Sequence, residues 1–209
     1  MNPNAVKSLK GKLCSDADSG VDLNRNYPLY WGTPETFTLG QTASYENDDC
    51  NDPCGECYRG EYAFSEPETR ALRDFITSHN KTLKFVVNLH SDGNQVIYPY
   101  NGMQDNLIES RNKDSFKTLS EIMEQAKFPV GNKHNGNSYK LMGDVIGGDM
   151  DDWILATFNI PSVTNELGTD SQFSNGWVVN SAQEAYTICK DNSEWIEFVY
   201  QKMGSWISL

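Results

Sequence analysis

The sequence predicts an α/β fold, because helix-like, strand-like and loop-like segments alternate along the chain. The clearest strand lies at residues 84–90, a short apolar run with two adjacent valines that ends in polar residues. The clearest helix follows residues 65–68, where Ser-Glu-Pro-Glu forms a capping box with proline in the first turn. The apolar residues that then follow at helical spacing are Ala71, Leu72, Phe75 and Ile76.

The other elements are assigned in the same way. Further helices are expected at residues 115–126, 151–158 and 183–204. Further strands are expected at residues 95–100 and 162–167. Gly, Asn and Asp are frequent at residues 131–149, which we therefore expect to be loop. Residues 28–60 form a longer loop, and loops of that length tend to be functional or held by cross-links.

Composition limits the classes of partner. The 209 residues suffice for one domain with a sizeable core, and 38% hydrophobic and 11% aromatic residues are typical of a globular protein. Seventeen Lys and Arg against 29 Asp and Glu give a net charge of −12, which argues against nucleic acid and membrane surfaces. This charge would attract a cationic peptide, although a solvated acidic surface explains it equally well. No apolar run approaches the roughly 20 residues that cross a bilayer.

The five cysteines are an odd number, and three of them cluster. Cys50, Cys54 and Cys57 lie close together, whereas Cys14 and Cys189 stand apart. The cluster has two interpretations, a metal knuckle or disulfides within the long loop. A structural zinc site usually needs four ligands, and no histidine lies near the three thiols, so disulfides and an oxidising compartment are favoured.

Three segments carry polar residues with catalytic or binding chemistry. Arg25 beside Asn24 offers a planar fork of donors and an amide, which suits a carboxylate, although a surface arginine next to a turn asparagine is the simpler explanation. His90 ends the strand at 84–90, where sites collect in α/β sheets but where a structural histidine is common. Glu166 ends the strand at 162–167, and a buried glutamate needs a partner or a metal.

Together and in this order, these segments resemble the signature series of zinc metallocarboxypeptidases of the carboxypeptidase A/B family. The resemblance runs from Asn2 to about Trp177, and five ordered motifs argue against a chance match. The motifs lie at residues 20–27, 58–60 with 64–69, 89–91 with 98–100, 152–153 and 166–167. The resemblance implies a mixed parallel and antiparallel β-sheet with helices on both faces.

The resemblance also implies a site with one zinc ion, held in this family by two histidines and a glutamate. His90 resembles the third zinc ligand. Asn24 and Arg25 resemble the pair that binds the free C-terminal carboxylate of the substrate. Glu166 resembles the catalytic carboxylate that takes a proton from the attacking water and returns it to the leaving amine. The implied activity is hydrolysis of the C-terminal peptide bond.

Two further substrate-binding roles follow from the resemblance. Asp151 falls where the family recognises the side chain that is removed, and an acid there resembles the B-type enzymes, which prefer C-terminal Lys or Arg. An exposed acid in an acid-rich turn is the alternative. Tyr139 is assigned to the tyrosine that caps the substrate. Cys14 and Cys54 resemble a family disulfide, whereas a bridge from Cys50 to Cys57 is inferred from their proximity.

The family's other two zinc ligands come from a His-x-x-Glu motif, which this sequence lacks. We therefore expect residues 1–209 to form one partial catalytic domain without its N-terminal part, with two of three ligands outside the chain. The alternatives are a zinc-free binder of peptide C-termini and a fragment that does not fold, because missing strands would leave an open sheet edge.

The expected partners are peptide or protein C-termini. Nucleic acid and membrane are not expected, and the chain is expected to be a monomer. The predicted disulfides place it outside the cell or in a vacuolar or lysosomal lumen.

Overall fold

The computed structural model describes residues 20–32, 50–103, 119, 134–169, 172–174 and 178–206. The helices are η2 (Leu23–Arg25, a 3-10 helix), α1 (Pro67–His79), α3 (Ser138–Met142), α4 (Met150–Phe158) and α5 (Ala182–Trp206). The strands are β1 (Val86–His90), β2 (Gln95–Ile97), β3 (His134–Gly136), β4 (Ser162–Glu166), β5 (Phe173–Ser174) and β6 (Val178–Val179).

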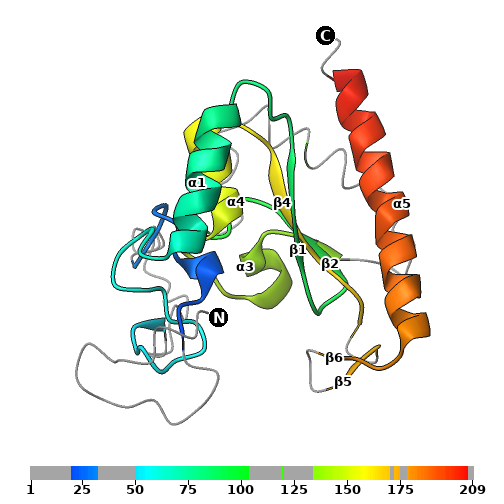
Figure 1. Cartoon of the computed structure of the whole chain (residues 1–209), viewed down its shortest axis with the longest axis horizontal. Helices are drawn as coiled ribbons and strands as arrows, with labels where there is room; N and C mark the ends of the chain where they lie inside the picture. Colours follow the sequence, from blue (N-terminus) through cyan, green and yellow to red (C-terminus); the bar gives the residue numbers. More distant parts are fainter. Residues whose placement is uncertain are drawn as a thin grey trace.

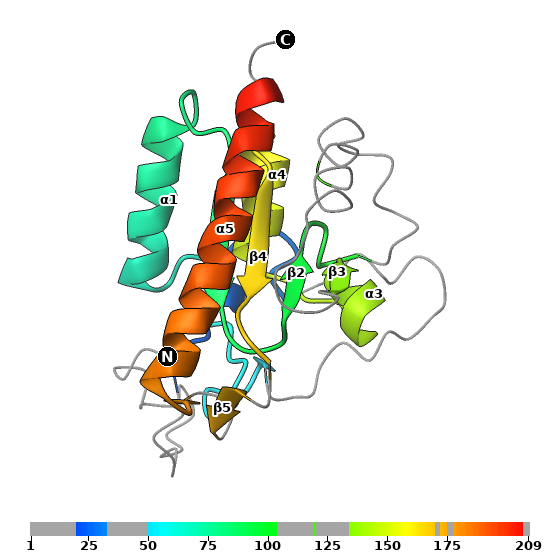
Figure 2. The ribbon, with the colours of Figure 1, turned by 90° about the vertical axis from the view of Figure 1, so that its right-hand side faces the viewer.

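Four of the strands form one mixed sheet in the order β1-β4-β2-β3. β1 runs parallel to β4, and β2 runs parallel to β3, whereas β2 and β4 are antiparallel. Helices α1 and α4 lie on one side of this sheet and α5 lies on the other (Figure 1; Figure 2 shows α5 across the near face). The predicted α/β class, with a mixed sheet and helices on both faces, is therefore confirmed.

Two apolar clusters fill the two faces of the sheet. The cluster under α5 includes Val163 of β4 and Trp195 and Val199 of α5. The cluster on the opposite face includes Ile76 of α1 and Ile154 of α4. Because successive strand residues point to opposite faces, β4 gives its odd-numbered side chains to the α5 face and its even-numbered ones to the α4 face.

Helix α1 begins later than the capping box predicts. Its N-cap is Glu66, with no side-chain capping bond, and Pro67 is its first residue. Ser65 does not cap the helix, because its hydroxyl accepts a hydrogen bond from Asn26 Nδ2 (2.9 Å) and donates one to Glu66 (2.8 Å). The capping-box prediction for Ser65 and Glu68 is wrong in this respect, although proline does occupy the first turn.

The apolar stripe predicted for α1 is only partly buried. Ile76 is buried, whereas Ala71, Leu72 and Phe75 are exposed in the described part of the molecule. Thr69 is the other buried residue of this helix. The apolar spacing predicted the helix correctly. It did not predict which side of the helix packs against α4.

The segment predicted as loop at 131–149 contains β3 and α3. Tyr139 lies in the first turn of α3, and His134 begins β3. Asn137 caps α3 by accepting from the backbone N–H of Lys140, and Gly143 ends it in the left-handed conformation. The other helices agree closely with expectation, but the predicted helix at 115–126 lies outside the described residues except for Leu119, which is helical and fully buried.

The long loop is cross-linked as expected. A disulfide joins Cys50 to Cys57, which excludes both as thiolate ligands of a metal knuckle. Cys54 is also disulfide-bonded, and its predicted partner Cys14 lies outside the described residues. Cys189 is an exposed free thiol. Of the helices in the described part of the chain, none is long and apolar enough to cross a membrane.

Replacing Ile154 with alanine should lower the free energy of unfolding by about 2–5 kcal/mol, because this fully buried side chain leaves a cavity between α4 and α1. The matched control is Leu72→Ala on α1, where the side chain is 45% exposed and the expected loss is under about 0.5 kcal/mol. Urea unfolding followed by tryptophan fluorescence measures both. Equal losses for the two variants would contradict the packing described for α4.

Candidate active site

The pairing of β1 with β4 brings two predicted site residues together. His90 is the register partner of Glu166 in this parallel ladder, and partners in register project from the same face. His90 Nδ1 lies 3.7 Å from Glu166 Oε1. Both side chains stand at the carboxyl ends of their strands, where binding sites collect in α/β sheets.

Burial keeps His90 in its neutral form. Desolvation lowers the pKa of the imidazole, while the carboxylates of Asp149 and Asp22 act to raise it and Arg25 acts to lower it. A lowered pKa means that the His90–Glu166 contact is not an ion pair at neutral pH. Neutral imidazole is the form that binds a metal ion, so the environment suits the ligand role predicted for His90.

Asn24 and Arg25, the pair predicted to bind a carboxylate, lie on the short helix η2. Asp22 caps this helix by accepting from the backbone N–H of Asn24 (2.9 Å). The Asp22 carboxylate also lies 3.8 Å from Arg25 Nη1, which itself donates to the carbonyl of Asn24 (3.0 Å). The Arg25 side chain remains partly exposed, so its guanidinium is held near Asp22 but not enclosed.

Helix η2 is fixed against the N-terminus of α4. The side-chain oxygen of Asn24 accepts from the backbone N–H of Met150 (3.2 Å), and the N–H of Tyr27 donates to the carbonyl of Gly148 (2.9 Å). Gly148 has a positive φ of 74°, and a β-carbon at this position would overlap the carbonyl oxygen of Arg25. Only glycine allows this close approach of the two backbones.

Asn26 anchors the other side of η2, a role that the sequence did not reveal. This fully buried side chain donates to the carbonyl of Arg59 (2.8 Å) and to the hydroxyl of Ser65 (2.9 Å), and it accepts from the hydroxyl of Thr69 (2.8 Å). It therefore joins the segment that carries Arg25 to the start of α1. Its place within the motif at 20–27 was the only available signal.

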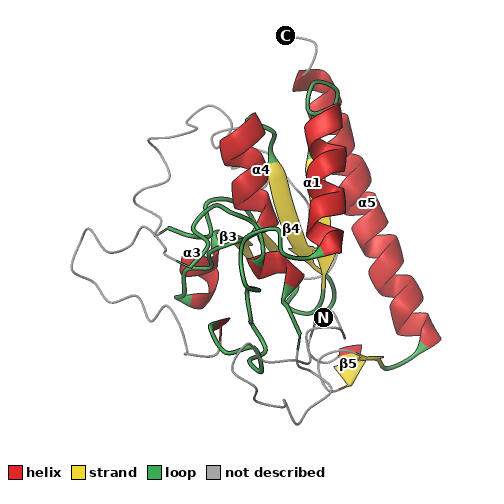
Figure 3. Cartoon of the chain, turned by 60° about the vertical axis from the view of Figure 1, so that its left-hand side comes forward, coloured by secondary structure: helices red, strands yellow, loops and turns green. Residues whose placement is uncertain are grey.

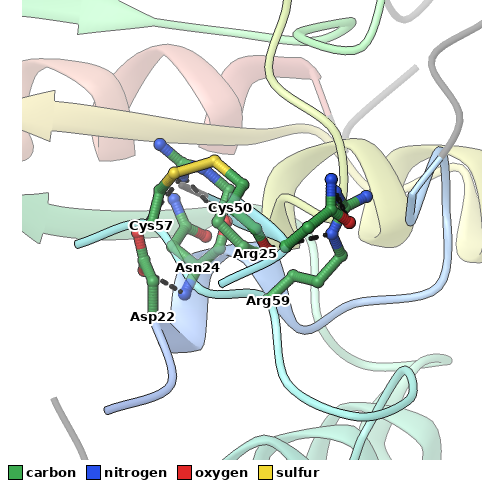
Figure 4. The surroundings of a disulfide bond; sticks show 7 residues. Asp22, Asn24, Arg25, Cys50, Cys57 and Arg59 are labelled. Carbon is green, nitrogen blue, oxygen red and sulfur yellow. Dashed lines mark hydrogen bonds and ion pairs between the residues drawn. A yellow bond between two sulfur atoms is a disulfide. The ribbon is translucent and has the colours of Figure 1, made fainter. Parts of the chain in front are cut away.

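The disulfide segment also supports η2, as Figure 4 shows. Arg59 donates from Nε to the carbonyl of Cys50 (3.3 Å) and from Nη2 to the side chain of Asn51 (2.6 Å). The carbonyl of Tyr58 then accepts from the backbone N–H of Asp22 (2.7 Å). The cross-linked loop thus reaches the residue that caps η2, and other loops gather at the same end of the sheet (Figure 3).

Asp151 is fully buried, so the alternative of an exposed acid is wrong. Its carboxylate accepts from Asn88 Nδ2 (3.1 Å), from the hydroxyl of Thr164 (2.7 Å) and from the hydroxyl of Ser162. Asn88 and Thr164 precede His90 and Glu166 by two residues and project from the same face of the sheet. Asp151 therefore contacts the sheet one strand repeat, about 7 Å, before the positions of His90 and Glu166.

Three acids of the α4 N-terminus are buried together. Burial, together with the neighbouring Asp149, raises the pKa of Asp151 to about 8. Burial likewise raises the pKa of Asp149 and of Asp152. Asp152 accepts from the backbone N–H groups of Asn101 (2.7 Å) and Gly102 (2.8 Å). From the residues alone, this acid-rich turn is typical of an exposed segment, and only the family resemblance of Asp151 pointed to a site position.

Tyr139 lies half-buried in the first turn of α3. The adjacent Ser138 donates its backbone N–H to the side chain of Asn101 (3.0 Å), so α3 is tied to the turn that follows β2. The role of Tyr139 in covering the substrate stays a prediction.

The described residues do not complete a zinc site. They contain no group of three or more His, Cys, Asp or Glu side chains that could hold a metal ion. The ligand role of His90 stays a prediction.

Comparison with known proteins decides the family. The model of a family described as zinc carboxypeptidase matches residues 4–192, which is well over half of the chain. The chain belongs to the zinc carboxypeptidase family. Among curated relatives, it is 29% identical to carboxypeptidase B of Helicoverpa zea over 82% of this chain and 37% of that protein. It is 31% identical to carboxypeptidase B2 of Bos taurus over 65% of this chain and 29% of that protein.

Solved structures of zinc carboxypeptidases share the fold. Bovine thrombin-activatable fibrinolysis inhibitor, in complex with tick carboxypeptidase inhibitor, aligns with a TM-score of 0.66 and 25% identity, covering 93% of this chain and 59% of the other. Carboxypeptidase A from Helicoverpa armigera aligns with a TM-score of 0.61 and 21% identity, covering 93% of this chain and 44% of the other. The chain thus spans roughly a third of the curated relatives' length and about half of the solved chains.

The raised pKa of Asp151 should make stability depend on pH. The folded state holds a proton that the unfolded chain releases between about pH 4 and pH 8, so the free energy of unfolding falls as pH rises through this window. Asp151→Asn cannot release that proton. Its stability relative to wild type should therefore increase with pH, by up to about 1.4 kcal/mol per pH unit.

Urea unfolding at pH 5, 6.5 and 8 measures this difference. Asp74→Asn, which changes an exposed acid of α1, is the control and should leave the pH dependence nearly unchanged. A constant difference between Asp151→Asn and wild type at all three pH values would show that Asp151 is ionised throughout.

Proposed function

We propose that this chain provides the proton-transfer and carboxylate-binding part of a zinc metallocarboxypeptidase, which removes C-terminal residues from peptides. The observation that carries the proposal is the 3.7 Å approach of His90 Nδ1 to Glu166 Oε1 on adjacent strands. Membership of the zinc carboxypeptidase family supports it. In this proposal His90 supplies one zinc ligand, and the other two come from outside these 209 residues.

Glu166 is the group proposed to move the proton. Its carboxylate stands at the end of β4 beside a neutral imidazole, where it can accept a proton from the attacking water and later deliver it to the leaving amine. A bound zinc ion would supply Lewis-acid polarisation of the scissile carbonyl. Within this chain, the register of β1 and β4 holds Glu166 beside His90, the proposed zinc ligand.

Arg25 and Asn24 are proposed to bind the free carboxylate of the substrate. A guanidinium offers two parallel donors to a carboxylate, and the adjacent amide adds a third. The attachment of η2 to α4 and α1 fixes these donors before the substrate arrives. Such fixed positioning would restrict cleavage to the last peptide bond.

Asp151 is proposed to favour substrates that end in Lys or Arg. Its carboxylate accepts from Thr164, one strand repeat before Glu166 on the face of the sheet that carries the His90–Glu166 pair. A cationic side chain would offset the cost of ionising this buried acid. The net charge of −12 also favours approach of a basic peptide end.

A second candidate function is a zinc-free binder of peptide C-termini. It is favoured by the way the Asn24–Arg25 pair is held, since Asp22 and the backbone of Met150 contact the pair without any metal ligand between them. Binding of a terminal carboxylate at this pair requires no metal ion. The two candidates share the same substrate contacts and differ in whether hydrolysis follows.

The cellular setting is proposed from the same features. The Cys50–Cys57 disulfide favours an oxidising compartment, either outside the cell or in a vacuolar or lysosomal lumen. We propose that the chain acts as a monomer on peptide or protein C-termini. A protein inhibitor is a further candidate partner, because one related structure is a complex with tick carboxypeptidase inhibitor.

Arg25→Ala should weaken binding of a peptide with a free C-terminus by about 10- to 100-fold, because charged hydrogen bonds to the carboxylate are lost. Fluorescence anisotropy with a labelled peptide measures the affinity. The same peptide with an amidated C-terminus should bind wild type as weakly as the free-carboxylate peptide binds Arg25→Ala. Arg73→Ala, on the exposed side of α1, is the control and should bind like wild type.

In the presence of EDTA, wild type should bind the free-carboxylate peptide with unchanged affinity, because protein contacts hold Asn24 and Arg25 in place. Equal binding of the acid and amide peptides by wild type would contradict the proposed role of Arg25.

Peptides that end in Arg should bind at least about fivefold more tightly than matched peptides that end in Leu, and Asp151→Asn should abolish this difference. The preference should increase from pH 6 to pH 9, because burial holds the pKa of Asp151 at about 8 and only the ionised carboxylate pairs with arginine. Anisotropy titrations with the two peptides at both pH values measure it. Tighter binding of the Leu peptide would end the proposal of basic specificity.

A further inference from the structure

Asn101 is a buried side chain whose hydrogen bonds reach two different helices. Its exposed fraction is 1%, and it follows β2 in the turn that leads away from the sheet. Its amide oxygen accepts from the backbone N–H of Ser138 in α3 (3.0 Å). Its amide nitrogen donates to the carboxylate of Asp149, the N-cap of α4 (3.3 Å). One side chain therefore joins the first turns of α3 and α4.

The backbone of Asn101 strengthens both connections. Its N–H donates to the carboxylate of Asp152 in α4 (2.7 Å), and its carbonyl accepts from the hydroxyl of Ser138 (2.9 Å). The same carbonyl also accepts from the N–H of Ile146 (2.7 Å), in the segment between α3 and α4. Each polar group of this residue thus has a partner, and each partner belongs to α3, to α4 or to the segment between them.

The N-terminus of α4 in turn holds the proposed carboxylate-binding pair. The N–H of Met150, next to Asp149, donates to the side chain of Asn24. Gly148, on the other side of Asp149, is in backbone contact with Arg25. A displacement of Asp149 would therefore reach both Asn24 and Arg25 through the residues beside it.

Asparagine is the residue type that fits this position. The bond from Ser138 needs an acceptor and the bond to Asp149 needs a donor, and a primary amide presents both in one plane. A carboxylate would have no proton to give and would repel Asp149. An apolar side chain would leave buried polar groups without partners on both helices, at a cost in stability.

We propose that Asn101 is a positioning residue for the substrate site, which sets the separation between α3, with Tyr139, and the Asn24–Arg25 pair. This inference rests on the proposed function, since it concerns how that site is held. Asn101 touches no substrate in this proposal, and it acts through Asp149 and Ser138. Its loss would therefore weaken the grip on a terminal carboxylate in a molecule that is still folded.

The test uses Asn101→Asp and Asn101→Ala in the whole chain, with Asn192→Ala as a matched control. Asn192 is also a buried asparagine, on the opposite face of the sheet, and its side chain accepts from Asn165 and donates to the carbonyl of Ile188 within α5. All three variants should lose stability. Only the two Asn101 variants should bind the free-carboxylate peptide at least about tenfold more weakly when folded, which corresponds to about 1.4 kcal/mol.

A pH series separates positioning from general destabilisation. In the described part of the chain, the titratable groups hydrogen-bonded to residue 101 are Asp149 and Asp152 at the start of α4, while its partner Ser138 in α3 does not titrate. In Asn101→Asp the new carboxyl can donate to Asp149 only when protonated. Peptide affinity relative to wild type should therefore recover between pH 8 and pH 5 in this variant, and Asn101→Ala should show no recovery.

The outcomes distinguish this inference from the function on which it rests. If folded Asn101→Ala binds the peptide as wild type does while Arg25→Ala does not, the positioning role is wrong and the carboxylate-binding pair stands. If wild type binds acid and amide peptides equally, the proposed function and this inference fall together. Asn101→Ala adds no charge, so it keeps the test decisive if Asn101→Asp does not fold.

Discussion

The parallel register of β1 and β4 is the constraint on which the whole site depends. It places His90 opposite Glu166 and Asn88 opposite Thr164 on one face of the sheet. A shift of one residue in either strand would turn that strand's polar side chains towards α5 and bring apolar ones into the site. The apolar contacts of Val163 under α5 oppose such a shift. Packing on the α5 face of the sheet therefore keeps His90 and Glu166 in position on the α4 face.

The N-terminus of α4 is the second organising feature, because three buried carboxylates meet there. Asp149, Asp151 and Asp152 would each be costly to bury alone. Donors offset the cost: backbone N–H groups for Asp149 and Asp152, and amide or hydroxyl groups of the sheet for Asp151. The positive end of the helix dipole adds to this stabilisation. As a result, one helical turn connects the sheet, the turn after β2 and the segment that carries Arg25.

The sequence predicted the local elements better than their contacts. Apolar runs and helical spacing located β1, β4, α4 and α5, and ordered motifs identified His90 and Glu166. The burial of the acidic turn could not be foreseen, because the donors to Asp151 come from residues 63 and 13 positions away. Helix α3 was missed because its surroundings are rich in Gly and Asn, although Asn137 and Gly143 are typical of helix ends.

Gly148 is a position at which backbone shape limits how the proposed Asn24–Arg25 pair can be held. Because the carbonyl of Arg25 occupies the space of a side chain there, no other amino acid fits without moving the backbone of Arg25. An attempt to transplant the arginine–asparagine pair onto another scaffold must therefore carry this glycine with it. A natural variant in which position 148 bears a methyl group or anything larger would be a candidate for a chain that folds with its Asn24–Arg25 segment displaced.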